Sequence, residues 1–172
     1  MSTWAVLATG PSMSQSVADS VRGRCGGVVA VSNAYLLAPW ADALVSNDSI
    51  WWKATPAAMK FAGRKFCGAK LTGTEQILLT GPFPLGSNSG LQGMRVAADI
   101  FLASKILLLG FDMHGDHFFG KHRAPLRVTT PGRMEVHKKQ FARWNGCPVV
   151  NCTTGSKLLC FPFGELSKEL GA

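Results

Sequence analysis

The sequence predicts a single α/β domain whose mainly parallel sheet is covered by helices on both faces. Short runs of Val, Ala, Leu and Ile alternate with segments of helical spacing, which is the pattern of strands joined by crossover helices. The apolar run at 106–109 suits a strand buried on both faces of a parallel sheet. The chain has 172 residues, of which 47% are hydrophobic and only 16% charged, enough for one domain with a sizeable core.

Seven apolar or extended segments are expected to form the strands: 4–8, 28–31, 43–45, 65–71, 76–80, 106–109 and 148–150. A rigid, proline-containing loop is expected at 81–86. Two further tail segments are an apolar stretch at 158–163 and a helical turn or two at 165–170.

Four longer helical segments are expected between these strands: 14–21, 50–62, 91–104 and 133–144. Ser12 or Ser14 is the expected cap of the first, and Pro56 is expected to kink or split the second. The third carries an apolar face that includes Leu102. The expected apolar contacts of the fourth are Val136, Phe141 and Trp144. Trp51 and Trp52 are interpreted as packing residues rather than ligand-stacking ones.

Composition excludes several classes of protein. No apolar run approaches the roughly 18 residues of a membrane span, and the first residues show neither a basic segment nor a cleavage site, so we expect no signal peptide. The five cysteines are odd in number and show no C-x-x-C spacing, which argues against a disulfide framework or a closed zinc site. We therefore expect buried, reduced thiols in a cytoplasmic protein, with Cys152, at a strand end, as the one to test for reactivity.

The net charge of +8 favours an anionic partner, which could be a nucleotide, a nucleic acid or an acidic glycan. The positive residues are densest between positions 121 and 143. Because no recognition motif accompanies them, nucleic acid is the less favoured partner. Association of the chain with itself as a homo-oligomer stays open.

The stretch from 106 to 117 holds the strongest indication of function. Its apolar strand breaks at Gly110 into a loop with two aspartates and two histidines. Ligands of open α/β sheets bind beyond the carboxyl ends of the strands. Most of the other polar clusters also follow apolar runs, so we expect them to converge on one cleft.

Two turns are candidate anion sites. Gly10, Pro11 and Ser12 lie between the first strand and the first helix, where backbone N–H groups and the helix dipole favour an anion. No GK[ST] follows, so this is not a P-loop, and an ordinary βα turn is the alternative. Ser89 and Gly90 open the third helix and form a second candidate site for an anion or a sugar. Asn33 is a candidate ligand contact or a capping side chain.

The loop after the opening strand admits three interpretations. His114 or His117 is a candidate general base, with Asp112 beside them. Asp112, His114, Asp116 and His117 together would instead suit zinc, manganese or iron. The third interpretation is a polar loop that is only structural. His122 and His137 are expected at the surface rather than in catalysis.

Six short motifs, taken in order, resemble a known family. They are Gly10–Ser12, Val31–Asn33, Asn47–Asp48, Ser89–Gly90, Leu108–Asp112 and Asn151–Ser156. This order is similar to that of the Rossmann-like bacterial sialyltransferases of glycosyltransferase family 42. It also resembles the related Maf-type flagellin glycosyltransferases and the archaeal 6-hydroxymethylpterin diphosphokinase, and small proteins of this appearance occur in bacteriophage genomes.

The resemblance implies a Rossmann-like nucleotide-binding domain over residues 1–172 and a nucleotide-linked donor of the CMP type. It assigns the phosphate to Gly10, Pro11 and Ser12, and a nucleotide or donor contact to Asn33. It assigns the donor site to Ser89 and Gly90, the ribose or cytosine to Phe111 and Asp112, and the base pocket to Ser156 and its neighbours, among them Asn151. Asp48 is a further binding candidate.

The chain also departs from that family. The sialyltransferases stabilise the departing phosphate with tyrosines, whereas this chain has only Tyr35, so Lys121, Arg123 or Arg127 would have to serve. The leading prediction is a transferase that uses a nucleotide or nucleotide-sugar donor. A pterin or nucleotide pyrophosphokinase is the second, with a divalent metal on Asp48, Asp112 or Asp116. A non-enzymatic module that binds or sequesters a nucleotide is the third.

Overall fold

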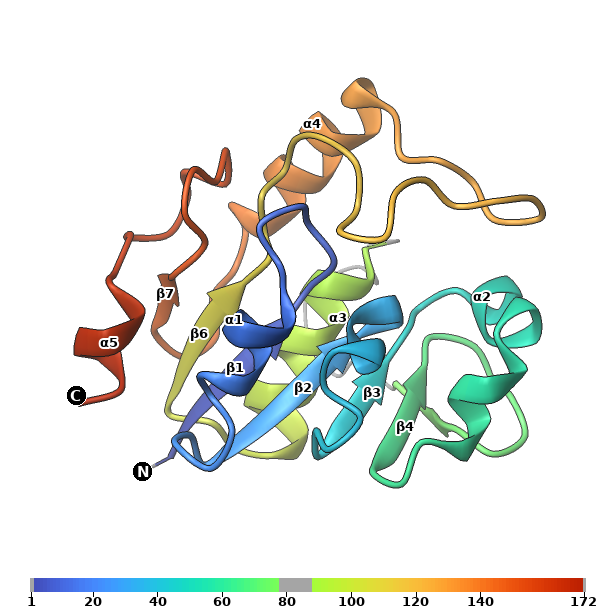
Figure 1. Ribbon diagram of the computed structural model, residues 1–172, viewed down its shortest axis with the longest axis horizontal. Helices are drawn as coiled ribbons and strands as arrows, with labels where there is room; N and C mark the ends of the chain where they lie inside the picture. The colour runs from blue at the N-terminus through green and yellow to red at the C-terminus, as the bar shows by residue number, and fades with distance from the viewer. Residues whose placement is uncertain (1, 78–87, 172) are drawn as a thin grey trace.

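The computed structural model describes residues 2–77 and 88–171, and within them seven strands form one all-parallel sheet (Figure 1). The strand order is β5-β4-β3-β2-β1-β6-β7. Their bounds are Thr3–Leu7 (β1), Gly27–Val31 (β2), Ala43–Val45 (β3), Arg64–Cys67 (β4), Glu75–Gln76 (β5), Lys105–Leu109 (β6) and Val149–Asn151 (β7). This confirms the predicted Rossmann-like α/β fold.

Helices cover both faces of the sheet (Figure 1). The core on one face includes residues of α1 (Gln15–Asp19), η1 (Ser32–Leu36), α2 (Ser49–Ala54) and η2 (Pro56–Lys60), with the residues bordering α5 (Leu166–Glu169) packed against it. The other core includes residues of α3 (Ser89–Arg95), its π-helical continuation η3 (Val96–Ile100) and α4 (Pro131–Phe141). From β1 the chain first moves towards β5 and then returns to β6 and β7. The connections between strands therefore run across the sheet in two opposite directions. Because such crossovers are right-handed, the helices of the two sets lie on opposite faces of the sheet.

The helix α3 lies very close to the centre of the sheet. A Cβ atom on Gly93 would come within 2.8 Å of Val31 Cγ2 and 3.2 Å of Val6 Cγ1. On the other face, Trp51 and Trp52 are buried, which confirms that they pack in the core. These contacts fix both layers against the sheet.

The helices differ from the prediction mainly at their ends. Ser14 caps α1 by accepting the N–H of Val17, and the predicted helix at 50–62 splits at Pro56 as expected. The helix expected at 91–104 begins earlier, at Ser89, because the side chain of Asn88 caps it, and it ends at Ile100.

Two residues expected on buried helix faces are exposed. Leu102 lies beyond the end of η3 with φ of 55° and is 76% exposed, so its predicted place on the helix face is wrong. Val136 of α4 is 52% exposed, whereas Phe141 is buried as predicted. β4 ends at Cys67, short of the expected 65–71, and the loop predicted at 81–86 lies outside the described residues.

The cysteines are all free thiols, but only Cys67 is fully buried. Cys160 is exposed, and the other three are half-buried at the edges of the core, so the expectation of five core thiols is wrong. Among the described residues, no helix is both long and apolar enough to cross a membrane.

One contact fastens the carboxyl ends of β1 and β6. Ser12 donates its N–H to Asp112 Oδ1 at 3.2 Å and its hydroxyl to Oδ2 at 2.8 Å. We call this pair the Asp112–Ser12 clamp. Gly10 lies against it, since a Cβ atom there would meet Asp112 Oδ2 at 1.8 Å and the Gly110 carbonyl oxygen at 2.6 Å. The glycine of this turn is therefore required by packing.

We predict that Gly10→Ala lowers the free energy of unfolding by about 3 kcal/mol, because the added methyl group has to displace the clamp. Gly132→Ala is the matched control, since a Cβ atom there meets nothing within 4 Å. Urea denaturation of both variants and the wild type measures the difference. Equal stability of the two variants would contradict the packing role of Gly10.

Candidate functional site

A cavity of about 570 Å³ lies at the carboxyl ends of the parallel strands. Its walls come mainly from the segments at the ends of four strands: 8–10 after β1, 31–32 at the end of β2, 46–51 after β3, and 110–111 with 113–117 after β6. Residues 88–90, at the start of α3, also line it. The polar segments after these four strands therefore meet in one cleft, beside the point where the strand order reverses at β1. This is where open α/β sheets bind ligands.

The rest of the wall comes from the strap, by which we mean residues 118–130, and from α4. The strap leads from the loop after β6 to α4, in yellow and orange at the top of Figure 1. The charged side chains of Lys121, Arg127 and Arg133 line the cavity, together with the carboxylates of Asp48 and Asp116. With neutral histidines, three cations against two anions leave an excess of one positive charge.

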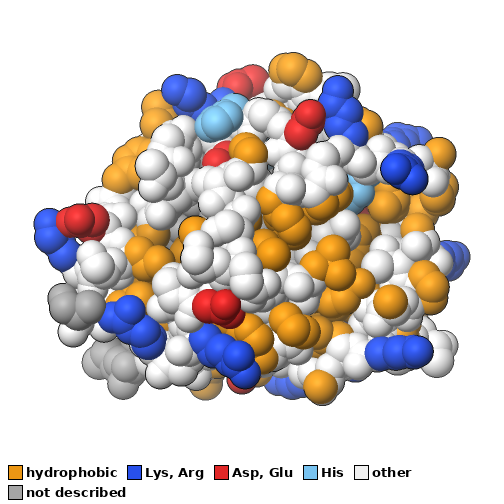
Figure 2. Space-filling view, in the orientation of Figure 1, with side chains coloured by type: hydrophobic (Ala, Val, Ile, Leu, Met, Phe, Trp, Pro, Cys, Tyr) orange, Lys and Arg blue, Asp and Glu red, His pale blue; other side chains and the backbone are white. Residues whose placement is uncertain are grey.

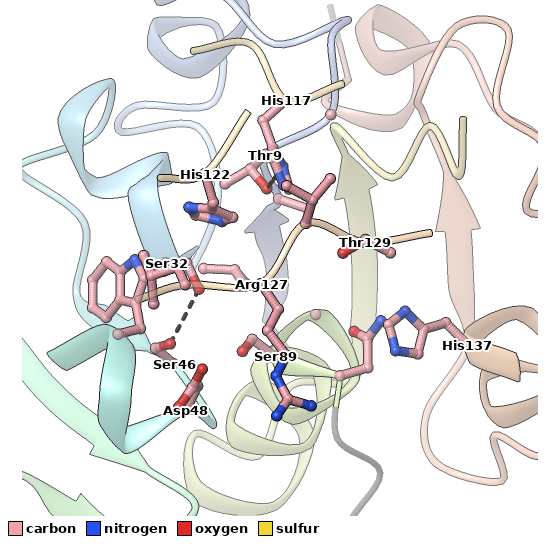
Figure 3. Close-up of a pocket in the computed structure, with 18 of the residues that line it drawn as sticks. Thr9, Ser32, Ser46, Asp48, Ser89, His117, His122, Arg127, Thr129 and His137 are labelled. Carbon is pink, nitrogen blue, oxygen red and sulfur yellow. Dashed lines mark hydrogen bonds between the residues drawn. The ribbon is translucent and has the colours of Figure 1, made fainter. Parts of the chain in front are cut away.

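His117 lies at the centre of a polar and aromatic cluster above the end of β1. Its Nδ1 atom is 2.8 Å from Thr9 Oγ1, and the neighbouring Phe118 N–H donates to the Thr9 carbonyl at 3.0 Å. The imidazole stacks on Phe119 with ring centroids 4.9 Å apart, and it lies 4.7 Å from the ring of His122. Figure 3 shows His117 directly beside Thr9 with His122 nearby. The ring is thus held in one orientation.

Burial favours the neutral form of His117 and His122. It lowers the pKa of His117, and a charge on His122 would lower that pKa further, while the backbone of Thr9 and the carboxylate of Asp116 act in the opposite direction. Burial also lowers the pKa of His122, opposed by the carboxylate of Asp48. A neutral imidazole in a cavity is suited to accept a proton at neutral pH.

Hydroxyl groups line the floor of the cavity. Ser89 Oγ accepts the N–H of Asn47 at 3.0 Å, and within residues 2–77 and 88–171 no acceptor takes its own proton. The hydroxyls of Ser32 and Ser46 lie 3.2 Å apart (dashed in Figure 3). Ser32 has φ of 47°, and Met113, also in the wall, has φ of 56°. Left-handed backbone at non-glycine residues costs energy and is concentrated at functional sites.

The Gly-Pro-Ser turn binds an anion, but that anion belongs to the protein. The Ser12 donors are used by Asp112, while the N–H groups of Gly10 and Met13 donate to the carbonyls of Gly110 and Gly10. Ser12, Pro11 and Asp112 do not line the cavity. The geometry favours a structural role for them over the predicted contacts with phosphate or ribose.

Asn151 and Ser156 also act within the protein. The Asn151 side-chain amide donates to Ser156 Oγ at 3.0 Å, and the Ser156 hydroxyl donates to the Phe111 carbonyl at 2.6 Å. Thr153 Oγ1 accepts the Phe111 N–H at 3.0 Å. This buried network fixes the backbone at the end of β6. Its members Asn151, Thr153 and Ser156 lie outside the cavity wall, whereas Phe111 is part of it.

The predicted residues therefore divide into two groups. Those that line the cavity are Gly10, Asp48, Ser89, Gly90, Phe111, His114 and His117. Those outside its wall are Pro11, Ser12, Asn33, Asp112, Asn151 and Ser156, and of these Asn33 accepts the indole N–H of Trp51 at 2.7 Å. Asp48 also caps α2 by accepting the Ile50 N–H.

Other wall residues were not predicted as part of the site. Thr9, Ser32 and Ser46 follow strands, so their positions at strand ends could have indicated them. His122 lies on the strap and His137 on α4, where the sequence has no comparable signal. His137 is only 8% exposed, so its predicted surface position is wrong. Burial, and secondarily Arg133, lowers its pKa.

The metal interpretation of the loop has no support in the geometry. Within residues 2–77 and 88–171, no group of three or more His, Cys, Asp or Glu side chains is arranged to hold a metal. Asp112 is engaged in the clamp, and His114 Nε2 lies 3.2 Å from the Gly155 carbonyl oxygen. Burial raises the pKa of Cys152 to about 11, so this thiol is poorly suited as a nucleophile at neutral pH.

Comparison of the chain with protein-family models, with curated proteins and with solved structures found no match. The resemblance to family 42 sialyltransferases therefore stays a prediction from short motifs. What function can be inferred comes from the cleft and the residues that line it.

We predict that the free energy of unfolding falls as the pH is lowered from about 7 to about 5. The pKa of His117 is lowered in the folded state, whereas in the unfolded chain a histidine titrates near 6.5. The unfolded state therefore takes up protons first, so the stability present above pH 6.5 is lost on acidification.

Urea denaturation at both pH values measures this loss, which should be smaller in His117→Gln than in the wild type. His114→Gln, which removes an exposed histidine, is the control, and carboxylate contributions cancel in the comparison. Parallel pH dependence of the wild type and His117→Gln would contradict the lowered pKa of His117 in the folded state.

Proposed function

We propose that the protein is a transferase that binds a nucleotide-activated donor in this cleft and passes the activated group to a hydroxyl acceptor. Sialyltransferase-like glycosyl transfer is the narrower form of the proposal. The observation that carries it is His117, a histidine of lowered pKa held against Thr9 inside a cavity at the strand ends. Such cavities in open α/β sheets are typical nucleotide sites.

His117 would act as the general base. With Nδ1–H donating to Thr9 Oγ1, the lone pair is on Nε2, which accepts the proton of the acceptor hydroxyl. The acceptor oxygen forms its bond to the sugar carbon as the bond from that carbon to the donor phosphate breaks. The phosphate leaves with the electron pair. Thr9 is then a positioning residue that fixes the imidazole.

Cationic side chains would stabilise the departing phosphate. Lys121, Arg127 and Arg133 line the cavity, and none of them forms an ion pair in the described part of the chain. Tyr35, the chain's one tyrosine, contacts Trp51 edge-on and is absent from the cavity wall. The cations would thus take the role that the resemblance assigns to tyrosines.

The two alternatives receive less support from the geometry. A pyrophosphokinase would require carboxylates that bind a divalent metal, but of the three candidates only Asp48 and Asp116 line the cavity. A module that binds or sequesters a nucleotide would need neither a base nor an acceptor site. Measured turnover of a donor distinguishes an enzyme from such a binding module, which leaves the nucleotide unchanged.

We predict that CMP and CMP-linked sugars raise the melting temperature of the wild type, whereas ATP with magnesium does not. Turnover of a donor that binds should fall about 10²–10⁴-fold in His117→Ala, because a general base contributes that much. The shift in melting temperature with CMP should remain. Lys139→Ala, an exposed α4 residue outside the cavity wall, is the control for turnover.

Each other outcome has a definite meaning. Binding with no turnover of any donor would indicate the sequestering module. A requirement for ATP and magnesium would indicate the pyrophosphokinase. No change in melting temperature with CMP, CDP, ATP or nucleotide sugars would contradict all three.

A further inference from the structure

The cavity contains a second chemical arrangement, separate from the His117 cluster. Arg127 extends from the strap into the cavity, and in Figure 3 its guanidinium lies beside Ser89, on the side away from Asp48. A cation thus comes from the roof of the cavity, and hydroxyl groups from its floor.

Among the residues that the structure describes, Arg127 has no ion-pair partner. Asp48 instead accepts the backbone N–H of Ile50 at 2.8 Å. The strap carries no Asp or Glu, so no carboxylate neighbouring in sequence neutralises Arg127.

The floor offers hydroxyl protons. Ser89 Oγ accepts the Asn47 N–H, and none of the described residues accepts the proton of its hydroxyl, which is available to a ligand. Ser32 can donate to Ser46 across 3.2 Å, which leaves the Ser46 proton free in the same way. A guanidinium fork beside hydroxyl donors suits a tetrahedral oxyanion, which has several acceptor oxygens.

We propose that Arg127 and Ser89 form a phosphate subsite, in which the guanidinium and the hydroxyl both donate to the phosphate of the donor. The subsite for a phosphate follows from the cavity itself, and only the assignment of that phosphate to a nucleotide donor rests on the proposed function. It identifies the ligand class as a phosphate ester and makes the strap part of the binding site. It also distinguishes Arg127 from Arg123 on the same strap. Both arginines are exposed, but only Arg127 lines the cavity.

Isothermal titration of the full chain with cytidine, CMP and inorganic phosphate tests the subsite. We expect the wild type to bind CMP about tenfold or more tightly than cytidine, as a charge-assisted hydrogen bond allows. Arg127→Gln should reduce this preference to about threefold or less, with cytidine affinity unchanged. Arg123→Gln removes the same charge and should retain the preference. Ser89→Ala should give a smaller reduction than Arg127→Gln.

Equal losses in Arg127→Gln and Arg123→Gln would overturn the subsite, since they would show only a general effect of net charge. Equal affinity of the wild type for CMP and cytidine would also overturn it. If neither CMP nor cytidine binds, the titration with inorganic phosphate tests the subsite. Phosphate binding that depends on Arg127 would keep the subsite and reject the nucleotide donor, whereas no phosphate binding would overturn both.

Discussion

The contact between Asp112 and Ser12 is the interaction on which the cleft depends. It joins the backbone that leaves β6 to the turn that leaves β1, and Gly10 is small enough to let the two approach. Backbone pairing extends beyond the strands through the Gly10 N–H, which donates to the Gly110 carbonyl at 2.9 Å. The loop after β6 is therefore held over the end of β1, where His117 meets Thr9. The carboxylate of Asp112 thus positions the residues that would act on a bound anionic ligand.

Much of the fold could be predicted because buried parallel strands are apolar on both faces. The segment Ala43–Val45 is only three residues long, yet its bounds were predicted correctly, since it is apolar and ends in polar residues. Pro56 splits a helix because it lacks the N–H that a helix interior needs. The end of η3 at Ile100 could not be predicted, because the apolar spacing continues through Leu102 although the backbone turns away.

The candidate site was predictable only in part, for a physical reason. Topology brings the carboxyl ends of neighbouring parallel strands together, which is why Asp48 and His117 were expected in the cleft. Sequence does not show whether a polar side chain faces a ligand or the protein's own backbone, as the buried bonds of Asn151 illustrate. The strap lacks helical or strand periodicity, and its path follows from tertiary contacts that bring His122 and Arg127 over the cavity.

The central claim is that the cleft beside the reversal of strand order is a nucleotide site. Its most direct test is a titration of isotope-labelled protein with CMP, followed by amide chemical shifts. We expect the largest shifts in the segments that follow β1, β2, β3 and β6 and in the strap, with little change at α5 on the far edge of the sheet. Shifts confined to another surface, or none at millimolar CMP, would contradict the claim.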